Sequence, residues 1–112
     1  DFLKAQIDRL EDIGVVREQI VIDPGIGFGK TLEHNLILLR NLSLFHGLGC
    51  PILLGVSRKG FIGKLGHEPD AAARAPGSIA VGLAALAQGV QFLRVHDVAE
   101  TVQAVRLWQA VR

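Results

Sequence analysis

The stretch from Gln19 to Lys30 decides the fold, and it reads QIVIDPGIGFGK. Its first four residues form a short apolar, β-branched run, which is typical of a strand buried on both faces of a parallel sheet. Asp23, Pro24 and Gly25 end the strand, and a glycine-rich loop then leads into an apolar helix predicted over residues 32–46. A strand, a loop and a crossover helix make one βα unit, so this stretch predicts an α/β protein with parallel strands.

The same unit occurs twice more along the chain. Two further strands are predicted over residues 51–54 and 91–95. Further helices are predicted over residues 1–13, 59–65, 78–88 and 97–112. The predicted order is therefore one helix followed by three βα units, with parallel strands covered by helices.

The last of these helices carries two local patterns. Its apolar residues recur at helical spacing and predict a buried stripe made of Val98, Val102, Val105 and Trp108. Asp97, with Glu100 three residues later, predicts a capping box at the start of the helix.

Composition excludes several classes of protein. Twelve basic and eleven acidic residues give a net charge of +1, and only five phenylalanines and one tryptophan are present, so we expect no nucleic-acid partner. No apolar stretch approaches the roughly 20 residues of a membrane span, and we expect no membrane partner. The single cysteine, Cys50, precedes an apolar run and is interpreted as a buried residue, with a reactive thiol as the alternative. A lone cysteine is compatible with a cytoplasmic location, which we expect.

The chain has 112 residues, begins at Asp1 and contains no methionine. We expect either a processed N-terminus or a piece of a longer chain.

Polar residues follow all three predicted strands. Asp23 follows the first strand, residues 57–59 (Ser-Arg-Lys) follow the second, and Arg94 and His96 end the third. The carboxyl ends of parallel strands meet at one edge of the sheet, where α/β proteins bind their ligands. A carboxylate near several cations and glycine-rich loops suits a substrate that carries a hydrogen-bond-donating ring and a phosphate.

Alternative interpretations remain for some of these residues. The glycine loop matches neither a P-loop nor the dinucleotide fingerprint, and a tight strand-to-helix turn also explains it. Asp23 is either a turn residue or a ligand-binding carboxylate. Arg58 and Lys59 stand where the helix dipole disfavours cations, which favours an anion-binding role. The remaining histidines lack metal-ligand spacing and are interpreted as surface residues: His34, His46 and His67.

Four motifs together resemble the C-terminal part of the bacterial dihydropteroate synthases. They are DPGIGFGKT at 23–31, GVSRKGFIG at 55–63, GS at 77–78 and RVHDV at 94–98. The resemblance runs from about Ile20 to the end of the chain and implies the last three βα units of a (β/α)8 TIM barrel. The single domain over residues 1–112 would then be a partial barrel whose N-terminal part is missing.

The resemblance also implies an activity and its ligands. The family condenses 6-hydroxymethyl-7,8-dihydropterin diphosphate with p-aminobenzoate, releases diphosphate with the help of Mg²⁺, and makes 7,8-dihydropteroate for folate synthesis. It is the sulfonamide target. Its members commonly form homodimers, and its metal ligand is expected in the missing N-terminal part.

Site roles are implied residue by residue. Asp23 would accept hydrogen bonds from the pterin ring, and Lys59 would contact the pterin and border the aminobenzoate pocket. Arg94 and His96 would hold the diphosphate. Phe28 and Ser57 would line the pocket in supporting roles, and no covalent nucleophile is evident.

The sequence departs from some relatives at Gly60, where they carry a serine that helps to hold the aminobenzoate carboxylate. Two other functions stay open: a pterin-binding barrel that transfers a methyl group from methyltetrahydrofolate to a corrinoid, and a non-catalytic half-barrel module. As a fragment, the chain is expected to be inactive alone.

Overall fold

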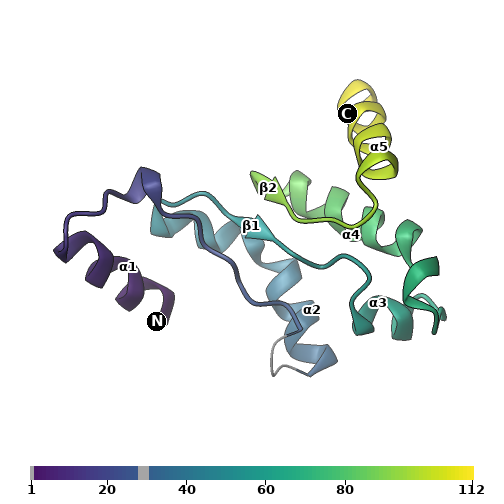
Figure 1. The fold of residues 1–112 in the computed structure, drawn as a ribbon, viewed down its shortest axis with the longest axis horizontal. Coiled ribbons are helices and arrows are strands. Elements are labelled where there is room, and N and C mark those ends of the chain that lie inside the picture. Colours follow the sequence, from purple (N-terminus) through teal and green to yellow (C-terminus); the bar gives the residue numbers. More distant parts are fainter. Residues whose placement is uncertain (1, 28–30) are drawn as a thin grey trace.

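The computed structural model describes residues 2–27 and 31–112. Helical segments precede each of the two strands, and one further helix follows the second strand (Figure 1). The α-helices are α1 (Phe2–Asp12), α2 (Leu32–Arg40), α3 (Gly60–Leu65), α4 (Ala75–Ala87) and α5 (Val98–Val111). Three 3₁₀ helices are η1 (Arg17–Gln19), η2 (Leu42–Leu48) and η3 (Ala71–Ala73), and the strands are β1 (Leu53–Leu54) and β2 (Phe92–Leu93).

The strands are parallel, as predicted, but shorter than predicted. Leu53 pairs with Phe92 and Leu54 with Leu93. The predicted strand over residues 19–22 forms only a parallel bridge between Ile22 and Ile52. Its first residue, Gln19, belongs instead to η1. β1 thus lies between the segment that ends at Ile22 and β2, which brings three segments side by side in chain order.

The core gathers around this central strand. Ile22, Ile52 and Leu54 are at most 4% exposed, and they pack with residues from the flanking helices. Cys50 is also buried, which confirms its interpretation as a core residue. Burial on both faces, which the apolar strands predicted, is met only in part, because Val21 is 49% and Phe92 50% exposed.

The predicted helix over residues 32–46 is divided in two. Thr31 caps its start by accepting a hydrogen bond from the backbone N–H of His34 at 3.2 Å. α2 ends at Arg40, and Asn41 closes its last turn. The backbone N–H of Asn41 donates to the carbonyl of Leu38, and its side-chain amide donates to the carbonyl of Ile37. The chain continues as the 3₁₀ helix η2, so residues 42–46 are helical as predicted but do not belong to the same α-helix.

The helix predicted over residues 78–88 begins earlier, at Ala75. Pro76 stands in its first turn, where the missing N–H costs no helical hydrogen bond.

The predicted buried stripe of α5 was wrong. Val98 is 59% and Val102 42% exposed, and none of the residues of α5 is buried. Val105 and Trp108 are half-buried. α5 packs against α4 and projects away from the strands (Figure 1). The helical spacing therefore identified an apolar face correctly, but the described residues cover that face only in part.

Among the described residues, no helix is both long enough and apolar enough to span a membrane.

Candidate functional site

A small hollow opens at the carboxyl ends of β1 and β2. Its volume is about 120 Å³, and it is lined by Gly55, Ser57, Lys59, Arg94, Val95 and His96. Four residues predicted from the strand ends therefore meet here: Ser57, Lys59, Arg94 and His96. The hollow lies at the edge of the sheet where ligand sites of α/β proteins form.

Ser57 positions the ring of His96. Its hydroxyl oxygen accepts the backbone N–H of His96 at 3.1 Å and lies 2.9 Å from Nδ1 of the same residue. Ser57 is 8% exposed, so these contacts are largely shielded from water. These two contacts fix the orientation of the imidazole ring relative to Ser57, and either Oγ or Nδ1 can supply the hydrogen between them.

Arg94 lies across Gly55. The backbone N–H of Arg94 donates to Leu54 at 2.9 Å, which anchors it to the end of β1. A Cβ at Gly55 would lie 2.9 Å from Nη2 of Arg94, so a larger residue at position 55 would displace the guanidinium. Within residues 2–27 and 31–112, the Arg94 guanidinium forms no ion pair with a carboxylate. Its charge is therefore available to a ligand.

Lys59 connects this hollow to a neighbouring one. Its Nζ donates to the carbonyl of Ile26, and its Cδ lies 3.3 Å from the place of a Cβ on Gly27. The second hollow, of about 240 Å³, is lined by Gly27, Leu32, Asn35, Lys59, Gly60, Phe61 and Lys64. Lys59 thus lines two hollows.

Asn35 holds the glycine loop, although it was not among the predicted site residues. Its Oδ1 accepts the backbone N–H of Gly27 at 2.9 Å, and the residue is 4% exposed. Gly27 itself has φ +87°, in the left-handed region that favours glycine. Asn35 directly follows two other polar residues, Glu33 and His34, so its local sequence did not distinguish it as the buried one.

Asp23 lines neither hollow. It is exposed, and its Oδ1 accepts the backbone N–H of Gly25 at 2.8 Å. This contact bears out the turn interpretation without testing the ligand role. Phe28, the other residue predicted on this loop, lies outside the described residues.

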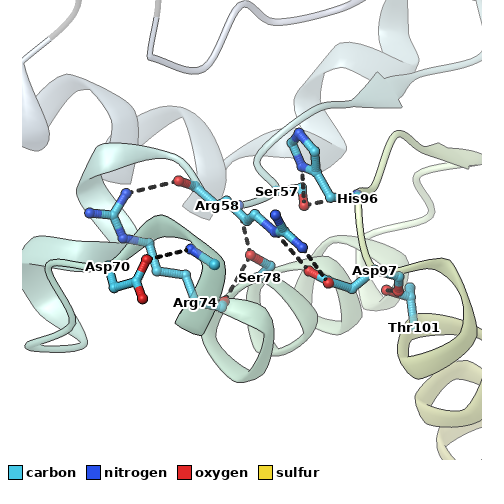
Figure 2. Close-up of polar contacts among 9 residues, drawn as sticks. Ser57, Arg58, Asp70, Arg74, Ser78, His96, Asp97 and Thr101 are labelled. Atoms are coloured by element: carbon cyan, nitrogen blue, oxygen red, sulfur yellow. Dashed lines mark hydrogen bonds and ion pairs between the residues drawn. The ribbon is translucent and has the colours of Figure 1, made fainter.

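Arg58 does not line the hollow, and its guanidinium pairs with a carboxylate of the same chain instead of facing it. Its guanidinium forms a two-pronged ion pair with Asp97, with Nε 3.1 Å from Oδ2 and Nη2 2.6 Å from Oδ1 (Figure 2). The hydrogen bond and charge of Arg58 lower the pKa of Asp97 from its usual value, against the opposing effect of burial. The same bond raises the pKa of Arg58.

The predicted capping box at Asp97 was wrong for the same reason. The carboxylate of Asp97 makes no capping hydrogen bond to α5, because both of its oxygens bind Arg58. The backbone carbonyl of Asp97 instead accepts the hydroxyl of Thr101 at 2.7 Å.

The backbone of Arg58 is held on both sides. Its φ is +58°, a left-handed conformation that is uncommon for a residue with a long side chain. Its N–H donates to Ser78 Oγ at 2.8 Å, and its carbonyl accepts Nη1 of Arg74 at 2.9 Å (Figure 2). Arg74 was not among the predicted site residues, since nothing in its local sequence indicates a partner 16 residues away.

The charges around the first hollow favour an anion. Lys59 and Arg94 line it, and none of its lining residues is a carboxylate. The nearest negative group along the chain, Asp97, is neutralised by Arg58. The described part of the chain contains no group of three or more His, Cys, Asp or Glu side chains that could hold a metal ion. His34, His46 and His67 are exposed, in agreement with their interpretation as surface residues.

Comparison with known proteins gives a consistent result. The family of pterin binding enzymes matches residues 1–96. The dihydropteroate synthase of Neisseria meningitidis serogroup C is 48% identical over 111 residues, which cover 98% of this chain and 39% of that protein.

Two solved structures are similar over almost the whole chain. The dihydropteroate synthase of Thermus thermophilus in complex with 4-aminobenzoate has a TM-score of 0.94 and 49% identity, covering 99% of this chain and 42% of that one. The enzyme of Xanthomonas albilineans in complex with 7,8-dihydropteroate has a TM-score of 0.95 and 44% identity, covering 98% and 43%. The chain therefore has the fold of part of a TIM barrel and spans well under half the length of these relatives.

Proposed function

The chain belongs to the pterin binding enzyme family, and on that premise we propose that it is the part of a dihydropteroate synthase that holds the diphosphate of the pterin substrate. The complete reaction would join 6-hydroxymethyl-7,8-dihydropterin diphosphate to p-aminobenzoate and release diphosphate. The observation that carries the proposal is the convergence of Lys59, Arg94 and His96 on one hollow at the carboxyl ends of parallel strands.

The diphosphate role of Arg94 and His96 rests on charge and access. Departure of diphosphate builds negative charge on its oxygens, and fixed donors facing that charge stabilise the transition state. The guanidinium of Arg94 offers several N–H donors, and His96 offers a ring N–H from an imidazole whose orientation Ser57 fixes. Ser57 acts here as support for His96.

Lys59 and Asp23 would bind the organic parts of the substrates. Lys59 borders both hollows, which suits contact with the pterin on one side and the aminobenzoate on the other. Asp23 is exposed, and its carboxylate accepts one hydrogen bond from the backbone N–H of Gly25. A carboxylate can accept several hydrogen bonds, so it can also accept those from the N–H groups of a pterin ring. The weak aniline nucleophile then needs chiefly to be positioned beside the pterin methylene carbon. Phe28 is proposed to line this pocket.

A Mg²⁺ ion would supply further charge stabilisation for the departing diphosphate. The described residues contain no group of three or more His, Cys, Asp or Glu side chains that could hold the ion by themselves. The metal requirement is proposed for the protein as a whole. A homodimer and a cytoplasmic location are proposed on the same family grounds.

The test is isothermal titration of the complete gene product that contains these 112 residues with the pterin diphosphate. We expect Asp23→Ala to weaken binding by about tenfold or more, because it removes hydrogen bonds to a charged acceptor. Asp8→Ala is the matched control, since Asp8 is a carboxylate on α1 that pairs with Lys4 at 3.0 Å. It should leave binding unchanged.

The reaction is tested separately by adding p-aminobenzoate and measuring released diphosphate. Absence of binding, or equal binding by the wild type and Asp23→Ala, would contradict the proposal. Binding of the pterin without diphosphate release would instead favour a methyl-transferring relative.

A further inference from the structure

The two loops that follow β1 and β2 are joined in the register of the sheet. The Ser57–His96 and Arg58–Asp97 contacts each link residues 39 positions apart, which is also the separation of Leu53 and Phe92 in the paired strands. Side chains therefore continue the parallel register beyond the last backbone pair. The hollow lies along this extension, and its geometry depends on keeping the two loops aligned.

The Arg58–Asp97 ion pair, the last of these contacts along the register, is the strongest candidate for the interaction that keeps the two loops aligned. Arg58 and Asp97 form two parallel N–H···O bonds, a geometry with more directional specificity than a single-point ion pair. The side chains are 30% and 15% exposed, so the pair is partly shielded from water. The backbone of Arg58 is meanwhile fixed to Ser78 and Arg74. A left-handed residue persists where surrounding contacts hold it in this way.

The neighbours of this ion pair are the residues that face the ligand. Arg58 stands between Ser57 and Lys59, and Asp97 directly follows His96. Fixing Arg58 to Asp97 therefore fixes the hydroxyl of Ser57 relative to the ring of His96 (Figure 2). We propose that Arg58 and Asp97 are positioning residues that hold His96 and Lys59 on the same anion-binding hollow. The identity of the anion, the diphosphate of the substrate, rests on the proposed function.

The alternative is an ion pair that only stabilises the fold. Two variants distinguish these roles. Asp97→Asn keeps the size of the side chain and removes its charge. Arg58→Gly removes the guanidinium while leaving a residue that adopts φ +58° without strain, so the backbone turn is preserved.

The matched control is Glu11→Gln. It breaks the Arg17–Glu11 ion pair, whose Nε–Oε2 distance is 3.1 Å and whose side chains are 33% and 37% exposed. Neither residue lines the hollow.

The first measurement needs no ligand. Side-chain nitrogen NMR of His96 in the complete gene product should show one neutral tautomer in the wild type and in Glu11→Gln. In Asp97→Asn and Arg58→Gly, we expect a mixture of tautomers, because Ser57 no longer meets Nδ1 in a fixed geometry. A purely stabilising ion pair would leave the tautomer unchanged below the unfolding temperature.

The second measurement is isothermal titration with inorganic diphosphate, well below the unfolding temperature of every variant. We expect both positioning variants to bind about tenfold more weakly or worse, as is common when a ligand-orienting partner is removed, and the control to match the wild type. Unchanged tautomers and unchanged diphosphate binding in both variants would overturn the inference. A wild type that bound no diphosphate would contradict the proposed function, while the His96 spectrum would still decide whether the ion pair positions the ring.

Discussion

Three consecutive residues in the loop after β1, residues 57–59, contact three different parts of the molecule. The left-handed backbone of the middle residue directs its side chain away from those of its two neighbours. Ser57 contacts the ring of His96, and Lys59 reaches the glycine loop at Ile26. Arg58 lies between them with φ +58° and directs its guanidinium to Asp97 instead. The left-handed turn thus lets two neighbours face the hollow while the residue between them binds the adjacent loop.

The Arg58–Asp97 ion pair should make the free energy of unfolding depend on pH within a defined acidic range. The pKa of Asp97 is lower in the folded protein than its ordinary value, so the stabilisation is fully present above the unfolded pKa of about 3.9. It is lost as the pH falls through the lower, folded pKa. We expect the difference in unfolding free energy between wild type and Asp97→Asn to be constant near neutral pH and to shrink below about pH 4.

Urea unfolding of both proteins across that range, with Glu11→Gln as a second reference, measures this difference. A gap that persisted undiminished at the acid end would show that the charge of Asp97 is not responsible.

At the residue scale, the sequence predicted only part of the group of side chains and not how they pair. Ser57, Lys59, Arg94 and His96 line one hollow, as the common end of parallel strands predicts. Asp23, expected at the same edge, lines neither hollow, and Arg58 pairs with Asp97 instead. Asp97 was assigned to a capping box because Glu100 follows at the right spacing. Its actual partner is 39 residues away, and only the strand register, which the sequence does not reveal, makes that pairing visible.

At the scale of elements, α3 and α4 are held together by contacts that leave no room for a β-carbon. A Cβ at Gly77 would collide with Cγ2 of Ile62, which is itself 5% exposed. A Cβ at Gly63 would lie 2.6 Å from Nη2 of Arg74. This packing brings the start of α4, with Arg74 and Ser78, against the backbone of Arg58.

Gly77→Ala should destabilise the protein even though alanine is the better helix former. Alanine gains about 1 kcal/mol in helix propensity, but forcing a methyl group into a filled contact costs about 1–3 kcal/mol. We expect a net loss in thermal unfolding of the complete gene product.

The double variant Ile62→Ala/Gly77→Ala tests the cause, because it removes the side chain that the new methyl group meets. The loss caused by Gly77→Ala should be smaller in the Ile62→Ala background than in the wild type. Strictly additive effects of the two substitutions would contradict a direct collision.

Element boundaries were predicted well where local signals decide them and poorly where distant packing does. α1 and α3 lie within two residues of their predicted limits. The apolar stripe of α5 predicted burial because periodicity identifies a face, but Val98 and Val102 are exposed. Whether that face is buried depends on which elements pack against it, and among the described residues its main neighbour is α4.

The molecule as a whole is more extended than a closed domain of its size. Its radius of gyration is 15.0 Å, against about 13 Å for a compact chain of this length. Its extents are 44 × 34 × 20 Å, and large apolar side chains such as Leu44, Leu107 and Val111 are exposed. The strands and helices follow the order of a barrel without closing one.

The isolated 112-residue chain should therefore catalyse no dihydropteroate formation. The hollow contains the proposed diphosphate side of the site, but the chain spans under half of its relatives' length. Diphosphate release from the pterin diphosphate and p-aminobenzoate should not exceed the buffer background. The complete gene product assayed in parallel provides the positive control, and turnover by the isolated chain would refute this expectation.

The position of β1 between two partners has a practical consequence. The segment ending at Ile22 and strand β2 each pair with β1 on one side, and neither has a second strand partner among the described residues. Such open edges are templates for pairing with another polypeptide. A separate polypeptide that offers an exposed strand can therefore add to this sheet at either edge, and backbone hydrogen bonds would then be the link between the two molecules.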